Sequence, residues 1–317
     1  MNGTPGGVNT HPAVTLSRRD HVAEVSTFGG GLRALRWRGR PLVEGYPAGS
    51  FPPLSANVIL APWPNRLTDG EFTVAGVRHR LAVTEPSRRT AIHGLVSDVP
   101  WSVVRSSPDA VTLAVDVDPR PGWPWPLRVT ASYLLDGDGL RAGLTVRNLS
   151  AWSCPVALGV HTYLSALGAP LDDCRVELPV DARLPLDPVR LTPTGEPGPL
   201  AGVVDPAGTP LRGRRFDDCL RAAPSDGAWR STRLTDARGD GVEALTSPSL
   251  GWFQVFTADP ATGTGFPGRG RALAVEPMTA PPDALRSGTG LTTLRPGGGF
   301  SVAWRLRAVR GGVPVPP

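Results

Sequence analysis

Apolar and polar residues alternate along the stretch from residue 111 to residue 146. In 111–117 every second residue is Val or Leu, and the same period of two recurs in 129–135 and 140–146. This period is typical of strands with one buried face. Between the last two segments lies the run Asp-Gly-Asp-Gly at 136–139, a composition that favours a tight hairpin turn. The stretch therefore predicts neighbouring antiparallel strands.

The rest of the chain repeats this pattern in short segments. With 38 Gly and 36 Pro among 317 residues, no window keeps an apolar helical period for three turns. We expect an all-β fold with very little helix, a large antiparallel β-sandwich in one domain over 13–310, with a flexible N-terminus at 1–12, a C-terminal tail at 311–317 and a Pro-rich excursion at 181–215. The further predicted strands are 13–17, 22–26, 32–37, 72–83, 155–161, 174–178, 229–234, 242–246, 250–257, 271–276 and 302–308.

Composition excludes several classes of protein. All 33 basic residues other than His are Arg, so lysine Schiff-base chemistry and P-loop phosphate binding are ruled out. The Arg residues are scattered and do not form the clustered patch of a nucleic-acid-binding protein. The three Cys lack CxxC spacing, and no HExxH or EF-hand pattern occurs, so we expect neither a disulfide framework nor a metal site.

The apolar segments of the sequence indicate where in the cell the protein is expected. The first ten residues contain no apolar core of a signal peptide, and no stretch approaches 18 uninterrupted apolar residues. We therefore expect a cytoplasmic protein that does not bind membranes.

Two of the five histidines lie next to buried-strand patterns. His93 lies in Ala91-Ile92-His93-Gly94, and His161 follows the apolar run 156–160. An imidazole at the end of a buried strand suits proton transfer in a cleft. A hydrogen-bonded core histidine is an equally good interpretation of either residue from the spacing alone.

Glu276 is the carboxylate with the most buried surroundings in the sequence. It ends the apolar run 272–275, where its pKa should rise by desolvation, as a general base near neutral pH requires. A salt bridge to an Arg is the alternative. The Pro-flanked Asn65-Arg66 could hold a guanidinium toward a polar ligand, and Trp63 could stack on a sugar face.

Five short segments together resemble the aldose 1-epimerase (galactose mutarotase-like) family, in the family's order and over nearly the whole chain. They are 57–70 with Asn65-Arg66, Ala91-Ile92-His93-Gly94, Gly159-Val160-His161-Thr162-Tyr163, Phe216-Asp217-Asp218 and 275–284 around Glu276. The resemblance implies the galactose mutarotase-like supersandwich and a cofactor-free interconversion of the anomers of a free hexose.

By position, the resemblance makes Glu276 the general base and His161 the general acid. Arg66, His93 and Asp217, preferred over Asp218, would contact the sugar, and Asn65, Trp63 and Tyr163 complete the expected sugar-binding set. The partner is then a small monosaccharide, with no metal and with a monomer or homodimer as the functional unit. A non-catalytic sugar-binding protein and a sugar-phosphate mutarotase are alternatives on the same fold. A glycoside hydrolase is less favoured, because it needs a second carboxylate beside Glu276.

Overall fold

Strands make up most of the ordered elements in the computed structural model, which describes residues 12–315. In this part of the chain the α-helix is a single turn, α1 (Ala284–Ser287), and three short 3₁₀ turns lie at Pro53–Ser55, Leu171–Asp173 and Pro260–Thr262. Of the expected flexible N-terminus at 1–12, only the last residue is described, and the last two residues of the chain also lie outside the described residues. The predicted all-β fold with very little helix is confirmed.

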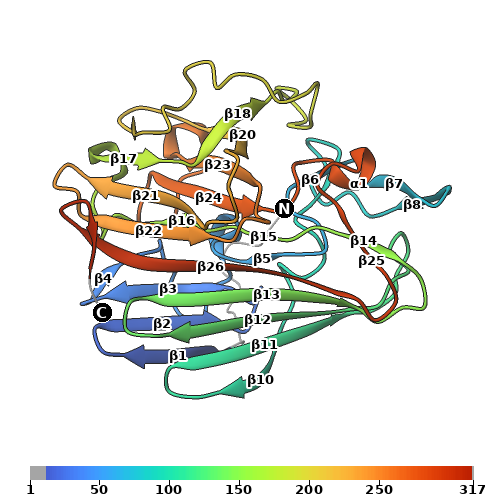
Figure 1. Ribbon diagram of the computed structural model, residues 1–317, viewed down its shortest axis with the longest axis horizontal. Coiled ribbons are helices and arrows are strands. Elements are labelled where there is room, and N and C mark those ends of the chain that lie inside the picture. The colour runs from blue at the N-terminus through green and yellow to red at the C-terminus, as the bar shows by residue number, and fades with distance from the viewer. Residues whose placement is uncertain (1–11, 316–317) are drawn as a thin grey trace.

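The larger layer is a ten-stranded sheet in which β26 (Gly299–Arg310) runs across the middle (Figure 1). On one side of it follow β13 (Leu140–Asn148), β12 (Leu127–Leu135), β11 (Ala110–Val117) and β10 (Ser102–Ser106). On the other side follow β22 (Gly241–Thr246), β21 (Arg230–Asp236), β17 (Cys174–Glu177) and β19 (Thr209–Pro210), and β27 (Val313–Pro314) pairs with β26. The predicted hairpin is β12–β13, closed by the Leu135↔Leu140 pair.

The second layer contains two sheets. The seven-stranded one has β18 (Val180–Leu184), β20 (Asp217–Ala222), β23 (Trp252–Ala258), β24 (Ala272–Met278), β15 (Gly159–Val160) and β5 (Ile59–Leu60), with β16 (Tyr163–Leu164) paired to β24. The four-stranded one has β1 (Ala13–Arg18), β2 (His21–Ser26), β3 (Leu32–Trp37) and β4 (Arg40–Pro41), and it packs on β11 and β12. Three two-stranded pairs complete the fold: β6 (Arg66–Thr68) with β9 (Thr90–Ile92), β7 (Glu71–Val74) with β8 (Val77–Arg80), and β14 (Cys154–Val156) with β25 (Thr292–Leu294).

The two layers bury their facing side chains against each other. Phe253 and Val275 of the seven-stranded sheet line the same small apolar gap as Trp304 and Leu306 of β26. One cluster of buried apolar side chains extends from Leu16 in β1 to Ala308 in β26. Because successive side chains on a strand point to opposite faces, the neighbours of Phe253 and Val275 face away from this core. That outer face is where polar side chains can gather.

Three expected segments differ in detail from the structure. The strand expected at 72–83 is a hairpin, β7–β8, because Ala75 and Gly76 both adopt left-handed backbone conformations, with φ of 48° and 79°. The strand expected at 155–161 is split into β14 and β15. The expected C-terminal tail contains β27, which pairs with β26.

The predicted Pro-rich excursion is a long connection from β18 to β19. It contacts the loop before β9, where Arg88 donates to the carbonyl of Val189. It also contacts the turn between β6 and β7, where Arg190 Nη2 lies 2.9 Å from Asp69 Oδ1. In the described part of the chain, no helix is long and apolar enough to cross a membrane.

Candidate active site

A row of polar side chains crosses the outer face of the seven-stranded sheet. Gln254 of β23 is the Cα partner of Glu276 on β24. On the other side of β24, the pairs Gly159↔Met278 and Tyr163↔Ala274 flank a gap. The same antiparallel register brings His161, midway between Gly159 and Tyr163, opposite Glu276. Phe253 and Val275 lie on the inner face, so the alternation of side chains places this row on the outer face.

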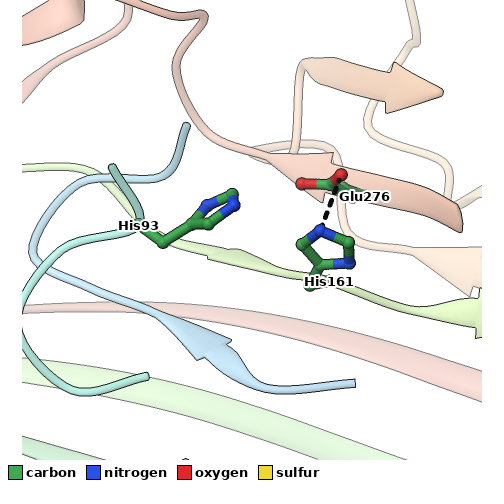
Figure 2. Close-up of side chains that lie close together, drawn as sticks. All are labelled: His93, His161 and Glu276. Carbon is green, nitrogen blue, oxygen red and sulfur yellow. Dashed lines mark ion pairs between the residues drawn. The ribbon is translucent and has the colours of Figure 1, made fainter. Parts of the chain in front are cut away.

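His161 and Glu276 are in direct contact at this point. Their closest atoms, His161 Nε2 and Glu276 Oε1, are 3.2 Å apart (Figure 2). Both residues are buried, with 6% and 2% of their surface exposed. The main chain of His161 is held by hydrogen bonds to the backbone of Asn57 (2.8 Å) and Val58 (3.0 Å). Its ring is also stacked on Tyr163, with centroids 5.4 Å apart. The imidazole is therefore fixed in position against the carboxyl group.

His93 reaches the same place from the end of β9. Its ring lies edge-on to that of His161, with centroids 5.2 Å apart, and points toward both partners (Figure 2). The backbone makes a sharp turn here, since His93 has a φ of 65° and Gly94 one of 78°. A Cβ on residue 94 would lie 2.1 Å from the carbonyl oxygen of Ala61, so only glycine fits this position. The glycine noted in the sequence thus allows His93 to face the pocket.

Arg66 is held by a carboxylate that the sequence did not point to. Glu85 accepts two hydrogen bonds from the guanidinium of Arg66, at 2.8 and 3.0 Å. It accepts a third from the hydroxyl of Thr90, at 2.7 Å. Arg88 also pairs with Glu85, at 3.1 Å. One carboxylate therefore partly neutralises two guanidinium groups at the pocket rim. Glu85 lies in a polar loop with no periodicity, so the sequence carried no signal for it.

A chain of side-chain hydrogen bonds connects Asn65 to Asp217 through Gln254. Asn65 donates to the Gln254 Oε1 atom at 3.2 Å, and Gln254 donates to Asp217 Oδ1 at 2.8 Å. Gln254 was missed in the sequence, although a Gln inside the apolar strand 252–258 is a buried polar group that needs partners. These two hydrogen bonds fix the orientation of the Gln254 amide between Asn65 and Asp217.

These side chains line one pocket of about 230 Å³. Its walls include the catalytic candidates Glu276 and His161, together with His93, Arg66, Asn65, Asp217, Gln254, Glu85 and Arg88. The size and the density of hydrogen-bonding groups suit one small polar molecule.

Burial sets the protonation of the pocket. Desolvation raises the pKa of Glu276 well above its usual range, with a further contribution from the charge of Asp217 and an opposing one from Arg66. Desolvation also lowers the pKa of His161 to about 4, and that of His93 well below its usual value. Burial raises the pKa of Asp217 as well, against the effect of Arg66. Burial thus acts against the charged form of both groups in the contacting pair of Glu276 and His161.

Two of the expected sugar-binding residues do not reach the pocket. Trp63 is 3% exposed and packs in the core against Trp123, with ring centroids 5.9 Å apart, so it has no free face for a sugar. Tyr163 is fully buried beneath His161 and positions that ring without lining the pocket. Of the two adjacent aspartates, Asp217 lines the pocket, whereas Asp218 pairs with Arg183 at 2.7 Å.

The arrangement of fold and pocket agrees with comparisons to known proteins. The family model described as aldose 1-epimerase matches residues 12–306, nearly the whole chain. The chain belongs to the aldose 1-epimerase family. Among solved structures, a galactose mutarotase-like protein of Clostridium acetobutylicum has a TM-score of 0.81 at 20% identity, covering 95% of this chain and 96% of its own. A putative aldose 1-epimerase of Escherichia coli K12 has a TM-score of 0.80 at 22% identity, covering 94% and 99%. At these identities the likeness shows the shared fold.

Sequence relatives of this aldose 1-epimerase family member differ in how much they cover. The uncharacterized protein YihR of Escherichia coli K12 is 28% identical over 289 residues, which are 90% of this chain and 89% of that protein. The galactose mutarotase of Sus scrofa is 33% identical over 144 residues, 44% of this chain and 41% of that protein. The human galactose mutarotase is 32% identical over 145 residues, again 44% and 41%. The match to these mutarotases thus spans less than half of their length.

Proposed function

We propose that this protein interconverts the α and β anomers of a free aldose by acid–base ring opening and reclosure. The observation that carries the proposal is the contact of His161 Nε2 with Glu276 Oε1, 3.2 Å apart, on the wall of a small polar pocket. The two oxygens that exchange protons in a cyclic hemiacetal, O1 and the ring oxygen, are bonded to the same carbon. An acid and a base that serve them must therefore lie next to each other, as these two do.

Each half of the reaction moves two protons. Glu276 takes the proton of the C1 hydroxyl while His161 gives one to the ring oxygen, and the C1–O5 bond breaks to leave an open-chain aldehyde. After rotation about C1–C2, the hydroxyl at C5 attacks the other face of C1. His161 then takes the proton of that hydroxyl and Glu276 returns one to the new C1 oxygen. The protein ends each cycle with its starting proton inventory.

One proton shared by Glu276 and His161 would let the two groups exchange the roles of acid and base. With one proton on the pair, either the carboxylate or the imidazole is available as base and the other carries the acidic proton. Asp217 and Arg66 line the same pocket with hydrogen-bonding groups of opposite charge, suited to sugar hydroxyls. Such a paired acid and base contributes about 10²–10⁴-fold per group to the rate.

A neutral sugar fits the rim better than a sugar phosphate. Arg66 and Arg88 are the guanidinium groups of the pocket wall, and both already pair with Glu85. A phosphate would have to compete with the Glu85 carboxylate for these two guanidinium groups. A free hexose carries only uncharged hydroxyl groups and needs no unpaired guanidinium at the rim.

Polarimetry with freshly dissolved α-D-glucose and α-D-galactose tests the proposal. The protein should speed the approach to the equilibrium rotation, and Glu276→Gln should lower kcat by about 10²–10⁴-fold while the protein stays folded. Glu177→Gln in β17, outside the pocket, is the matched control and should keep full activity. Undiminished turnover by Glu276→Gln would remove this carboxyl from the mechanism. A panel of pentoses and hexose phosphates then identifies the preferred sugar.

A further inference from the structure

The three residues of Figure 2 have a second chemical capability besides proton transfer. His93, His161 and Glu276 come from the end of β9, from the link between β15 and β16, and from β24. One ligand atom of each lies within 4.8 Å of those of the other two, and all three side chains are more than nine-tenths buried. Two imidazoles and one carboxylate converging on one point form a donor set for a divalent transition metal.

Several of their polar atoms have no partner. Glu276 Oε2 and the Nδ1 atoms of both histidines are buried without a hydrogen bond. A buried carboxylate oxygen left unpaired is costly, and an incoming cation would compensate it.

We propose that this pocket binds one divalent transition-metal cation of the Zn²⁺ class through His93, His161 and Glu276, and that the bound metal excludes the sugar. The two nitrogen donors favour Zn²⁺, Co²⁺ or Ni²⁺ over Mg²⁺ and Ca²⁺, which take oxygen ligands. The fourth position of a tetrahedral ion would face the open pocket, as in zinc sites with two histidines and one glutamate.

The geometry sets the strength of this site. With metal–ligand bonds of about 2.0–2.1 Å, tetrahedral ligand atoms lie about 3.3 Å apart, and His161 Nε2 and Glu276 Oε1 already match that at 3.2 Å. The largest separation within the set, up to 4.8 Å, requires a small movement of a side chain, such as that of His93. Neither histidine holds a second-shell partner on Nδ1, and each missing partner costs about 10–100-fold in affinity. The site should therefore bind Zn²⁺ more weakly than a site whose histidines have such partners.

Occupancy by a metal conflicts with the proposed catalysis. A cation on Glu276 and His161 takes the lone pairs that accept protons from the sugar, so Zn²⁺ is an inhibitor competitive with the aldose. This inhibitory part rests on the proposed function, whereas metal binding itself does not. Binding and inhibition are therefore measured separately.

Calorimetric titration of the untagged, full-length protein with ZnCl₂ tests the binding. We expect one Zn²⁺ per chain, at least tenfold weaker binding after His93→Gln or Glu276→Gln, and unchanged binding after His79→Gln. His79 is the control because it lies outside the pocket, stacked on Phe72. Co²⁺ added to the unmodified protein should give the intense visible absorption of a tetrahedral ion, and Zn²⁺ should displace it. The Co²⁺ absorption measurement uses the unmodified protein, so it does not depend on the folding of any variant.

The opposing results are equally clear. Wild-type protein that binds no Zn²⁺ at millimolar concentration, equal affinity in wild type and both pocket variants, or equal binding of Mg²⁺ would each overturn the metal site. If Zn²⁺ binds at the three residues but saturating Zn²⁺ leaves polarimetric turnover of an active preparation unchanged, the exclusion of sugar is overturned and the metal site stands. If no sugar in the panel is turned over, the proposed function fails while the titration still decides on the metal.

Discussion

The pH dependence of turnover follows from the burial of His161. Burial lowers its pKa from the usual 6.5 to about 4, because a charged imidazole loses its hydration in the pocket. This shift corresponds to about 3 kcal/mol against the charged form. In the proposed mechanism, the pair of His161 and Glu276 carries one proton. Adding a second proton at low pH leaves no base, so activity should fall as the pH drops through about 4.

The acid limb of the pH profile distinguishes the buried His161 from an exposed histidine. At pH 5.5 a histidine with a pKa of 6.5 is only about 9% neutral, whereas one with a pKa of about 4 is roughly 97% neutral. We therefore expect kcat/KM at pH 5.5 to stay close to its value at pH 7. Desolvation raises the pKa of Glu276, so the alkaline limb, where the shared proton is lost, lies above the usual range of a carboxyl group.

The assay is polarimetry of a freshly dissolved sugar between pH 3.5 and pH 9, with the rate in buffer alone subtracted at every pH. The ratio kcat/KM is the right quantity because it reports the free enzyme. Circular dichroism at each pH shows that the protein remains folded. An acid limb with its midpoint near 6.5 in folded protein would refute the argument that burial keeps His161 neutral.

Three further outcomes follow from the two faces of the site sheet. Gln254→Leu removes the link between Asn65 and Asp217 and should lower kcat/KM about 10–100-fold, as expected for a lost hydrogen bond to a charged group; steady-state polarimetry measures it. Phe253→Ala, one residue away on the core face, should cost about 3–5 kcal/mol in the free energy of unfolding in urea, with kcat of the folded protein nearly kept. Asp217→Asn should raise KM about tenfold with little change in kcat, the range of a lost hydrogen bond to a charged group. The matched Asp218→Asn should leave KM within twofold and cost less than ~1 kcal/mol, since its partner is largely exposed; equal effects on KM would contradict the placement of Asp217 in the pocket.

The fold was predictable because its signal is local. A period of two is visible within six residues, and the frequent Pro and Gly residues exclude long helices wherever they occur. The sandwich and the β12–β13 hairpin followed from these patterns. The error at 72–83 has the same origin, since Ala75 gives no sign in the sequence that it adopts a φ of 48°. A left-handed alanine is uncommon, so the turn was not expected there.

The contact between His161 and Glu276 was predictable only as two separate residues. His161 and Glu276 each end an apolar run, and this identified them as buried titratable groups. Their contact depends on the register of β24 against β15 and β16, which is set by pairing over more than 100 residues of sequence. A slip of one residue would turn Glu276 toward the core and Val275 toward the pocket. The family resemblance supplied this pairing, because the local pattern could not.

Trp63 and Gln254 also show that a local pattern does not tell a core residue from a pocket residue. Trp63 was expected to stack on a sugar, yet it packs in the core against Trp123, which comes from another segment. Gln254 lies in a strand that reads as apolar, yet it is the residue that connects Asn65 to Asp217. In both cases the side chain type is compatible with core or pocket. The face of the sheet decides between them, and that face is fixed by long-range register, which no local pattern encodes.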